Sequence, residues 1–376
     1  MQIDIPLIPE LGRNDRRVLG LLFRHRALTQ SGLVEQTQLT QQSVSRILAR
    51  LGETGLVGTG GRVSAEGRRG YPSTALSLRP EHGFSLGIAV LAGRVSLVIS
   101  DFSGATRAQK GLSLNPVGVS RTLDAVDEAL DELCGSVGYA RSQLTGIGIA
   151  VSGSFIAGGG FNTPTYLEEW AGIDVERLFA DRFGVIALAD NDGNAAAVAE
   201  SQFGVGRWAD SFAYLYISAG VGGGVILDGE PWRGRHGNAG EFAGGLPPHI
   251  FPFPNLELLR QLVVREGEAF DTVDAMVQGF NADWPAIEEW IARVKDSLSI
   301  IASNATAILD VDAIVLGGQM PTELAHRVIP HIELFDQKRR SVPRPVARIV
   351  PAEASGEVAA IGASLLPLKR LFFGAE

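Results

Sequence analysis

The sequence predicts a winged helix-turn-helix at the N-terminus, followed by a larger α/β body. The 376 residues allow two or three domains, and 45% hydrophobic with 20% charged residues is typical of a globular protein. The first 80 residues show helical periodicity and then glycine-rich strand-like segments, whereas β-type runs dominate after Phe84. No signal-peptide pattern and no stretch of roughly 18 apolar residues is present, so we expect a cytoplasmic protein that does not enter the membrane.

Charge is unevenly distributed along the chain. Residues 1–80 contain 11 Arg, no Lys and 6 acidic residues, a net charge of +5, so the remaining residues must carry −14 to give the total of −9. A basic head on an acidic body is the pattern expected when a DNA-binding unit is attached to something that does not touch DNA. A solvated surface explains the charge alone equally well. The single cysteine, Cys134, excludes an intrachain disulfide and a multi-cysteine metal site.

Three helical segments open the chain. Apolar residues recur at helical spacing over Asp15–Arg26, which predicts a first helix. Thr29 and Thr40 each precede a further helical segment, and threonine is a favoured N-cap. The gap Thr37–Leu39 between these segments has the length of the turn in a helix-turn-helix.

The third of these helices presents a polar face. Val44, Ile47, Leu48 and Leu51 follow the i, i+3, i+4, i+7 pattern and should face the core. The residues predicted to enter the major groove of DNA are Gln41, Gln42, Ser43, Ser45 and Arg46. Gln pairs well with adenine and Arg with guanine through bidentate hydrogen bonds. The alternative is a helix face that is merely solvated.

A wing follows the third helix. Gly55–Val57 begins a strand, Gly58–Arg69 is rich in glycine and arginine, and Thr74–Leu78 returns as a second strand. Arg68 and Arg69 combine two cations with a flexible backbone, which fits contact with phosphate or the minor groove. The alternative is a mobile charged linker.

The body begins with alternating β-type runs. Phe84–Val90, Val95–Asp101 and Thr106–Leu114 predict three antiparallel strands, followed by a helix over Arg121–Cys134 and a buried strand over Gly146–Val151. Further strands are expected over residues 185–188, 212–217, 222–227 and 313–316, and further helices over residues 285–308 and 356–372.

Three motifs lie in order between Asp190 and Glu241. They are the expected turn Asn191-Asp192-Gly193-Asn194, the glycine run Ser218-Ala219-Gly220-Val221-Gly222-Gly223-Gly224, and Gly237-Asn238-Ala239-Gly240-Glu241. In this order and spacing they resemble the sugar-binding core of the ROK family (repressors, open reading frames and kinases). The resemblance runs from about Phe84 to the C-terminus. The first 80 residues resemble the winged helix-turn-helix of the family's repressor branch, which includes xylose- and N-acetylglucosamine-type sugar repressors.

This resemblance implies a ribonuclease-H-like actin/hexokinase fold in two lobes. The expected domains are a winged helix-turn-helix over 1–80, a first lobe over 81–193 plus 352–376, and a second lobe over 194–351. The last helix would return to pack on the first lobe, and the ligand would bind between the lobes.

The resemblance also implies roles for individual residues. Asp192 matches the catalytic base of the family's kinases, and Glu241 matches a carboxylate that accepts hydrogen bonds from sugar hydroxyls. The predicted sugar-binding residues are Gly153, Tyr166, Asn191, Asp192, Glu241 and Glu257. The predicted remnant of a nucleotide loop consists of Gly220, Gly222, Gly223, Gly317 and Gly318. The alternatives are a simple tight turn for the Asn-Asp string and ordinary hairpin glycines for the rest.

Departures from the family pattern narrow the function. Family kinases carry an acidic residue and a Gly-Gly-Thr loop for magnesium and phosphate, whereas Gly87–Arg94 has Ala89, Leu91 and Ala92 in this region. We therefore expect no catalysis and no cofactor. The family's zinc-binding cysteines are missing and only His249 lies nearby, so we expect no metal. Tyr166 stands where the family has a sugar-binding Asn, which predicts an unusual ligand.

Three hypotheses for function remain. The first is a sugar-responsive transcriptional repressor that binds an inverted-repeat DNA operator as a homodimer or dimer of dimers. The second is an ATP-dependent sugar kinase with a DNA-binding head. The third is a regulator whose body binds a protein partner, such as a sugar-transport phosphotransferase subunit. Ligand, operator and target genes are not specified by the sequence.

Overall fold

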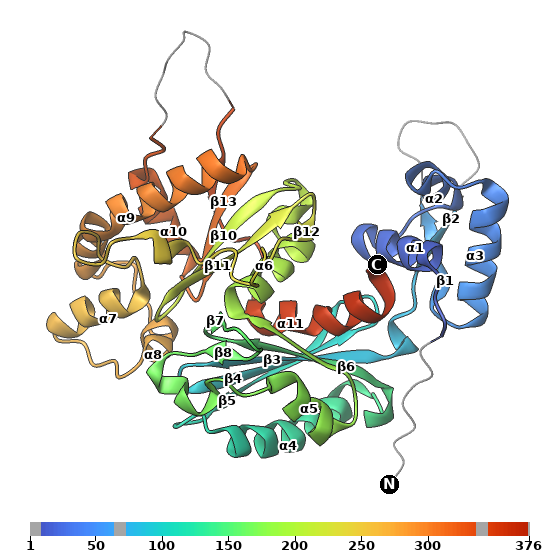
Figure 1. Cartoon of the computed structure of the whole chain (residues 1–376), viewed down its shortest axis with the longest axis horizontal. Helices are drawn as coiled ribbons and strands as arrows, with labels where there is room; N and C mark the ends of the chain where they lie inside the picture. Colours follow the sequence, from blue (N-terminus) through green and yellow to red (C-terminus); the bar gives the residue numbers. More distant parts are fainter. Residues whose placement is uncertain (1–8, 64–72, 336–344, 375–376) are drawn as a thin grey trace.

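The computed structural model describes residues 9–63, 73–335 and 345–374. The head, at the right of Figure 1, contains three helices and a two-stranded antiparallel hairpin. These elements are α1 (Arg13–His25), α2 (Gln30–Thr37), α3 (Gln41–Glu53), β1 (Val57–Val63) and β2 (Ser73–Leu78). The predicted caps are confirmed, because the side chain of Thr29 accepts the Gly32 N–H and that of Thr40 accepts the Ser43 N–H. β1 extends six residues into the predicted glycine-rich excursion.

A five-stranded mixed sheet forms the first half of the body. Its strands are β3 (Phe84–Leu91), β4 (Arg94–Asp101), β5 (Thr106–Ser113), β6 (Leu144–Val151) and β9 (Ala187–Asn191), in the order β5-β4-β3-β6-β9. As predicted, β3, β4 and β5 pair antiparallel, whereas β6 joins β3 in parallel and β9 joins β6 in parallel. Helices α4 (Val119–Val137) and α5 (Val175–Phe183) pack on one face, where they share a hydrophobic core with alternate residues of β3.

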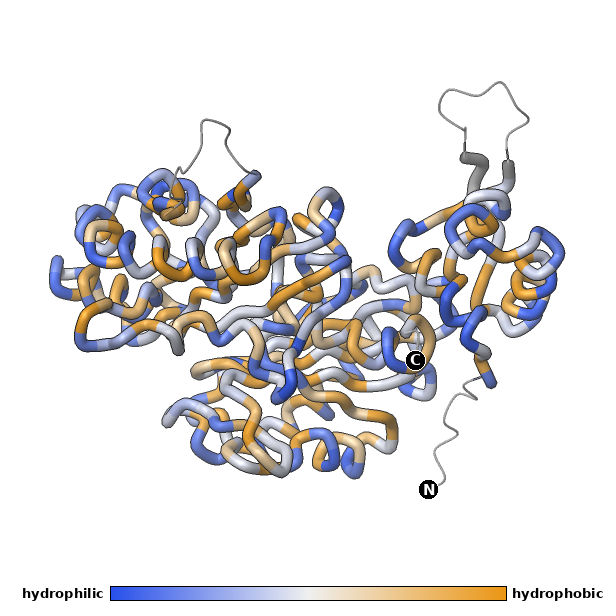
Figure 2. Tube along the Cα trace, turned by 45° about the horizontal axis from the view of Figure 1, so that its top comes forward, coloured by the Kyte–Doolittle hydropathy of each residue, from blue (hydrophilic) through white to orange (hydrophobic). Residues whose placement is uncertain are grey.

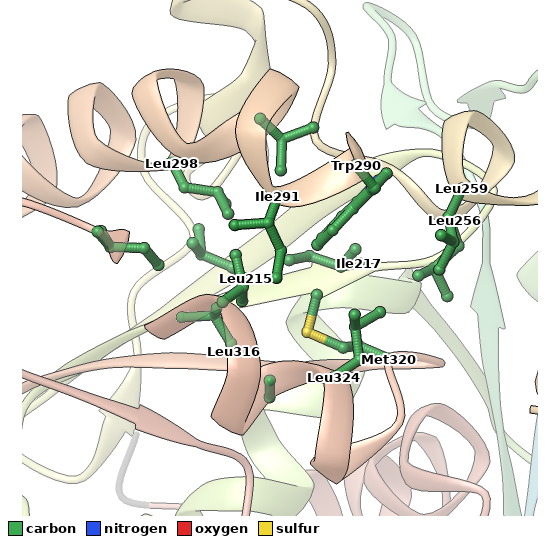
Figure 3. Close-up of a cluster of buried hydrophobic side chains, with 14 of the residues drawn as sticks. Leu215, Ile217, Leu256, Leu259, Trp290, Ile291, Leu298, Leu316, Met320 and Leu324 are labelled. Carbon is green, nitrogen blue, oxygen red and sulfur yellow. The ribbon is translucent and has the colours of Figure 1, made fainter. Parts of the chain in front are cut away.

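A second five-stranded sheet forms the other half of the body. Its strands are β10 (Phe212–Ile217), β11 (Val221–Leu227), β12 (Glu230–Pro231), β13 (Ala313–Gly318) and β14 (Arg348–Pro351), in the order β12-β11-β10-β13-β14. The helices of this half are α7 (Leu256–Arg265), α8 (Val273–Gln278), α9 (Ala286–Leu309) and α10 (Thr322–Val328). Trp290 and Ile291 of α9 pack against Leu215 and Ile217 of β10 in its core (Figure 3).

Two helices lie between the sheets. α6 (Asp192–Phe203) and α11 (Val358–Leu368) pack closely together, and α11 also covers β3 and β6. A Cβ atom on Gly362 would overlap the carbonyl oxygen of Ala195, and one on Gly87 would overlap that of Ala360. These glycines therefore allow the backbones of α11, α6 and β3 to approach each other. The predicted return of the last helix onto the first sheet is confirmed.

Two local predictions are wrong. Asn191–Asn194 was expected to be a turn, but β9 continues through Asn191 and α6 starts at the next residue. The reason is capping, since the Asn191 side chain accepts the N–H groups of both Gly193 and Asn194 and so begins the helix directly. Gly317 and Gly318 were expected after a strand, but they are its last two residues because both pair with β10.

The head shares a hydrophobic core with the body. After α11 the chain makes a π-helical turn, Lys369–Phe373, that lies beside α1 (Figure 1). Phe23 of α1 stacks on Phe373 with 4.5 Å between ring centroids. Hydrophobic and hydrophilic residues are intermixed along the trace in head and body alike (Figure 2). One buried hydrophobic cluster contains residues of α1, α3, α6 and α11. No local sequence pattern predicts this junction.

The small elements complete the path of the chain around the cleft described below. They are the hairpin β7 (Ser154–Phe155) and β8 (Phe161–Asn162), and the 3-10 segments Thr165–Trp170 and Phe242–Gly245. Within the described residues, no helix is both long enough and apolar enough to cross a membrane.

Candidate functional site

A cavity of about 310 Å³ lies where the ends of both sheets meet. It receives residues that follow β6 and β9 of the first sheet and residues at the β10–β11 turn of the second. The lining residues are Ser152, Gly153, Ser154, Asn162, Thr163, Pro164, Tyr166, Asn191, Asp192, Tyr216, Ser218, Gly220, Val221, Gly222 and Glu241. We call this cavity the cleft. It brings together five of the six predicted sugar-binding residues.

Asp192 is the most deeply placed carboxylate of the cleft. Its side chain is 6% exposed, and it accepts a hydrogen bond from the Ser152 hydroxyl (Oγ to Oδ2, 2.5 Å) and one from the Gly193 N–H (3.0 Å). Burial raises the pKa of Asp192 to about 6, against these hydrogen bonds, and the nearby Glu241 adds to the rise. Asp192 is therefore mostly ionised at pH 7 and can accept a hydroxyl proton in a hydrogen bond. Ser152, which orients it, was missed because no local motif marks it.

Asn191 shapes the cleft more than its exposed surface indicates. Its amide oxygen caps α6, and its amide nitrogen donates to the carbonyl of Gly153 at 2.7 Å. The bond ties the start of α6 to the segment after β6. Gly153 has a φ of 144°, and a Cβ there would crowd the backbone of Asn162, so glycine is required at this position.

An ion pair between a buried carboxylate and a partly exposed guanidinium lies next to Asn191 in the chain. Asp190, 1% exposed, accepts hydrogen bonds from the backbone N–H of Asn191 and the side-chain amide of Asn194. Its other oxygen binds the Arg233 guanidinium, with an Nη2 to Oδ2 distance of 2.7 Å. Arg233 follows β12, so the pair joins the two halves of the body beside the cleft. Sequence reasoning missed it because its partners are far apart in the chain.

Glu241 lines the opposite side of the cleft. The segment that carries it is held by Asn238, whose amide donates to the Phe155 carbonyl (2.9 Å) and accepts the Phe155 N–H (2.7 Å). Because Phe155 belongs to the β7–β8 hairpin, these bonds connect the halves of the body at the rim of the cleft. Partial burial raises the pKa of the Glu241 carboxyl.

Two tyrosines add aromatic surface. Tyr216, at the end of β10, is 3% exposed, and burial raises its pKa well above the usual range. Tyr166 is 43% exposed, and partial burial together with the charge of Asp192 raises its pKa to about 12. Both therefore present neutral hydroxyl groups at pH 7. Tyr216 was missed because it looks like an ordinary strand residue.

Some predicted residues do not reach the cleft. Glu257, in the first turn of α7, instead forms a 2.6 Å ion pair with Arg260, which lowers the Glu257 pKa. Gly220 and Gly222 line the cleft, whereas Gly223, Gly317 and Gly318 do not. Gly317 and Gly318 contact Tyr214 instead: the Tyr214 hydroxyl accepts the Gly318 N–H at 2.8 Å, and the Tyr214 ring packs against Gly317.

The segment that departs from the family's phosphate loop is a tight hairpin. β3 ends at Leu91 and β4 begins at Arg94, with Gly93 at a φ of 70°. Arg94 forms ion pairs with Asp274 (3.1 Å) and Glu357. Among the residues that the structure describes, no cluster of three or more His, Cys, Asp or Glu side chains could hold a metal ion.

The predicted DNA-contacting face lies on α3, on the side of the head away from the body (Figure 1). Gln41, Gln42, Ser45 and Arg46 are exposed, whereas Ser43 is half-buried and its hydroxyl lies 2.9 Å from that of Thr40. The core positions Val44, Ile47 and Leu51 are buried as predicted and Leu48 is half-buried. Arg68 and Arg69 of the predicted wing contact lie outside the described residues.

Comparisons with known proteins agree with this architecture. Residues 88–249 match the ROK family, and residues 11–70 match the MarR family. The chain is 29% identical to uncharacterized protein y4fQ of Sinorhizobium fredii over 98% of its own length and 94% of that protein. It is 26% identical to the xylose repressor of Bacillus spizizenii over 61% of its length, a match that spans 59% of the repressor.

A solved structure supports the fold of the whole chain. The crystal structure of a ROK family transcriptional regulator, a homolog of the E. coli MLC protein, covers 96% of this chain and 96% of its own with a TM-score of 0.69 at 19% identity. This similarity extends over the head as well as both halves of the body. The chain therefore combines a ROK-type body, matched over residues 88–249, with an N-terminal helix-turn-helix of the MarR type, the organisation of a transcriptional regulator with a DNA-binding domain.

Proposed function

We propose that this regulator is a sugar-responsive repressor. It binds its operator through α3 and the wing as a homodimer on an inverted repeat, and a sugar in the cleft changes its affinity for DNA. The exposed Gln and Arg side chains of α3, the +5 charge of residues 1–80 and the similarity to a xylose repressor support this proposal. Within the cleft, Asp192 and Glu241 would accept hydrogen bonds from sugar hydroxyls, while Tyr166 and Tyr216 would offer donors and apolar ring surface.

Helix α6 is the observation that carries the proposal. Its first residue, Asp192, lines the cleft, and its last turn contacts the head, where the Gln202 amide donates to the Phe23 carbonyl at 3.0 Å. Val198 of the same helix belongs to the hydrophobic cluster shared with α1. A ligand that shifts the start of α6 therefore acts on an element that is packed against the DNA-binding head. A ligand changes DNA affinity only if it favours one placement of the head over another.

The kinase alternative is less well supported. At Gly317, one of the glycines expected to contact a nucleotide, the Tyr214 side chain packs against the backbone. β3 and β4 are joined by the two residues Ala92 and Gly93, which replace the family's Gly-Gly-Thr loop. We therefore propose that the sugar is bound and not phosphorylated. ATP turnover by the full chain with a panel of sugars would contradict this part of the proposal.

Operator binding tests the proposal. The operator is first isolated from random duplexes with the full chain, and a sugar is chosen by thermal shift. Sugar should change operator affinity by about five- to 150-fold, the usual range of coupling of 1–3 kcal/mol. Asp192→Ala should abolish this response and leave sugar-free operator binding nearly normal, because nothing in the head is changed.

The matched control is Asp296→Ala, the same substitution at an exposed position of α9. It should respond to sugar like the parent. An Asp192→Ala protein with a normal response would show that the cleft is not the sensor.

A further inference from the structure

We infer that the cleft selects sugars by charge: it accepts neutral or amine-bearing sugars and excludes sugar phosphates and uronic acids. This inference rests on the proposed function and names the class of ligand for the same cleft. Its basis is the composition of the lining, which contains two carboxylates, Asp192 and Glu241, and no Lys, Arg or His. Like charges that approach within a few ångströms in a partly desolvated site repel strongly.

The surroundings do not reverse this charge. Arg233 is bound to the buried Asp190, with both of its contacts to that carboxylate below 2.9 Å. The acidic balance of the body acts in the same direction, since residues 81–376 carry −14. An anionic ligand therefore meets negative charge both at short range and on approach.

The start of α6 is the element most able to attract an anion. The N-terminus of a helix offers free N–H groups and a favourable dipole. Here the N–H groups of Gly193 and Asn194 are bonded to the Asn191 amide oxygen, at 2.8 and 3.2 Å, and Gly193 also donates to Asp192. The amide oxygen of Asn191 and the carboxylate of Asp192 thus occupy the N–H groups that a ligand phosphate would use.

A neutral or cationic sugar fits the same groups. Carboxylates accept hydrogen bonds from sugar hydroxyls, and an ammonium group forms stronger, charge-assisted ones. Tyr216 and Tyr166 add ring faces beside the two carboxylates, and such faces attract cations. An amino sugar should therefore bind at least as tightly as its neutral parent.

Matched sugar sets test this inference on the full-length protein. Each set contains a neutral parent, its 2-amino-2-deoxy form, its phosphate and its uronic acid, with D-glucose, D-galactose, D-mannose and D-xylose as parents where the derivative exists. Calorimetric titration at pH 7.5 should show one set in which the parent or amino sugar binds and the phosphate and uronate bind at least about tenfold more weakly.

Isosteric variants show whether charge is the cause. Asp192→Asn and Glu241→Gln each remove one negative charge with little change of shape. Each should therefore reduce the difference in binding affinity between the parent sugar and its anionic derivatives. Glu323→Gln, at an exposed position of α10, removes the same charge away from the cleft and should leave the difference unchanged.

The outcomes separate the two proposals. A phosphate or uronate that binds as tightly as its parent overturns the inference about charge and leaves sugar sensing intact. The inference about charge is also overturned if Asp192→Asn and Glu241→Gln leave the difference in affinity between parent and anionic sugars unchanged. Absence of binding by every set contradicts sugar sensing itself, and the inference falls with it.

Discussion

The cleft and the junction between head and body are both places where distant parts of the chain meet. The cleft is lined mainly by polar side chains, whereas the junction is packed from apolar ones. The cleft is lined by carboxylates, hydroxyls and glycines, and its two acids have no basic residue in the lining. The junction is apolar, with Phe23 stacked on Phe373 at 4.5 Å and Phe102 edge-on to Phe372 at 4.9 Å. The cleft therefore costs folding free energy that a ligand can offset, whereas the junction stabilises the protein by itself.

This difference indicates how the two regions divide their tasks. Apolar packing between close-packed surfaces resists small deformations, so the head follows movements of the elements it packs on. The head of this protein is accordingly attached to the body by a core, in addition to the chain connection at residues 79–83. α6 contributes to both regions, with Asp192 in the cleft and Val198 in the junction.

Removing an aromatic ring from the junction should have the largest effect. Phe23→Ala deletes a side chain that is 4% exposed, and such a cavity typically costs about 3–5 kcal/mol of unfolding free energy. The variant should also lose the sugar response of operator binding more than it loses sugar binding, because the head is then loosely packed. Denaturant unfolding and calorimetric titration measure the two effects.

Phe335→Ala is its matched control, since that ring is 59% exposed and its loss should change stability by no more than about 0.5 kcal/mol. Equal stability of the two variants would mean that the junction contributes little to the fold.

A change in the cleft should act in the opposite direction. The pKa of Asp192 is raised from 3.8 to about 6, so between these values the folded protein holds a proton that the unfolded chain releases. The contribution of the Asp192 carboxyl to the free energy of unfolding therefore falls as pH rises through this window. The full loss of stability is reached above about pH 6. Asp192→Asn removes the deficit and should stabilise the protein by up to about 3 kcal/mol at pH 8, with little gain at pH 4.

Urea unfolding at both pH values measures this gain, and Asp296→Asn at an exposed site is the control. A variant that is destabilised at pH 8 would show that Asp192 is held favourably in its ionised form, and the contrast between cleft and junction would fail.

Substitutions on the DNA-contacting side of the head should change DNA binding without acting through the cleft or the junction. Arg46→Ala should weaken operator binding by about 1–3 kcal/mol at one base position, because a bidentate contact to guanine is lost. Arg68→Ala, at a position outside the described residues, should weaken all sequences alike and reduce the salt dependence of binding by about one ion. Binding to operators with single base changes, at several salt concentrations, distinguishes the two. Equal loss on every sequence for Arg46→Ala would assign that residue to the DNA backbone.

Local signals explain which parts of the fold were predictable. Thr29 and Thr40 cap helices through their own side chains, so the boundaries of α2 and α3 follow from a few neighbouring residues. The alternation in β3 and β4 likewise predicts their pairing. The junction was not predictable because the apolar residues of α11 would suit any core, and nothing local says that Phe373 meets Phe23.

The site was predictable only where residues are adjacent in sequence. Asn191 and Asp192 were found together because one motif contains both. Ser152, the partner of Asp192, and Arg233, the partner of the neighbouring Asp190, come from segments about 40 residues away on either side. Glu257 does not line the cleft as predicted, because its carboxylate forms an ion pair with Arg260, one helical turn later. Prediction by resemblance is weakest where the family's characteristic residues are missing, as in residues 245–254 before α7, which contain four prolines and no cysteine.

The smallest effect is expected at the polar edge of the junction. Arg24 of α1 and Asp210 form an ion pair at 2.5 Å, but their side chains are 51% and 70% exposed. Water and salt screen such pairs, which contribute about 0–1 kcal/mol. Arg24→Gln should therefore leave unfolding free energy and the sugar response nearly as they are in the parent, like the control Arg177→Gln on α5, whose side chain is 78% exposed. If Arg24→Gln instead approached the effect of Phe23→Ala in unfolding and operator titrations, the head would be held mainly by charge, and its attachment should then weaken as salt is raised.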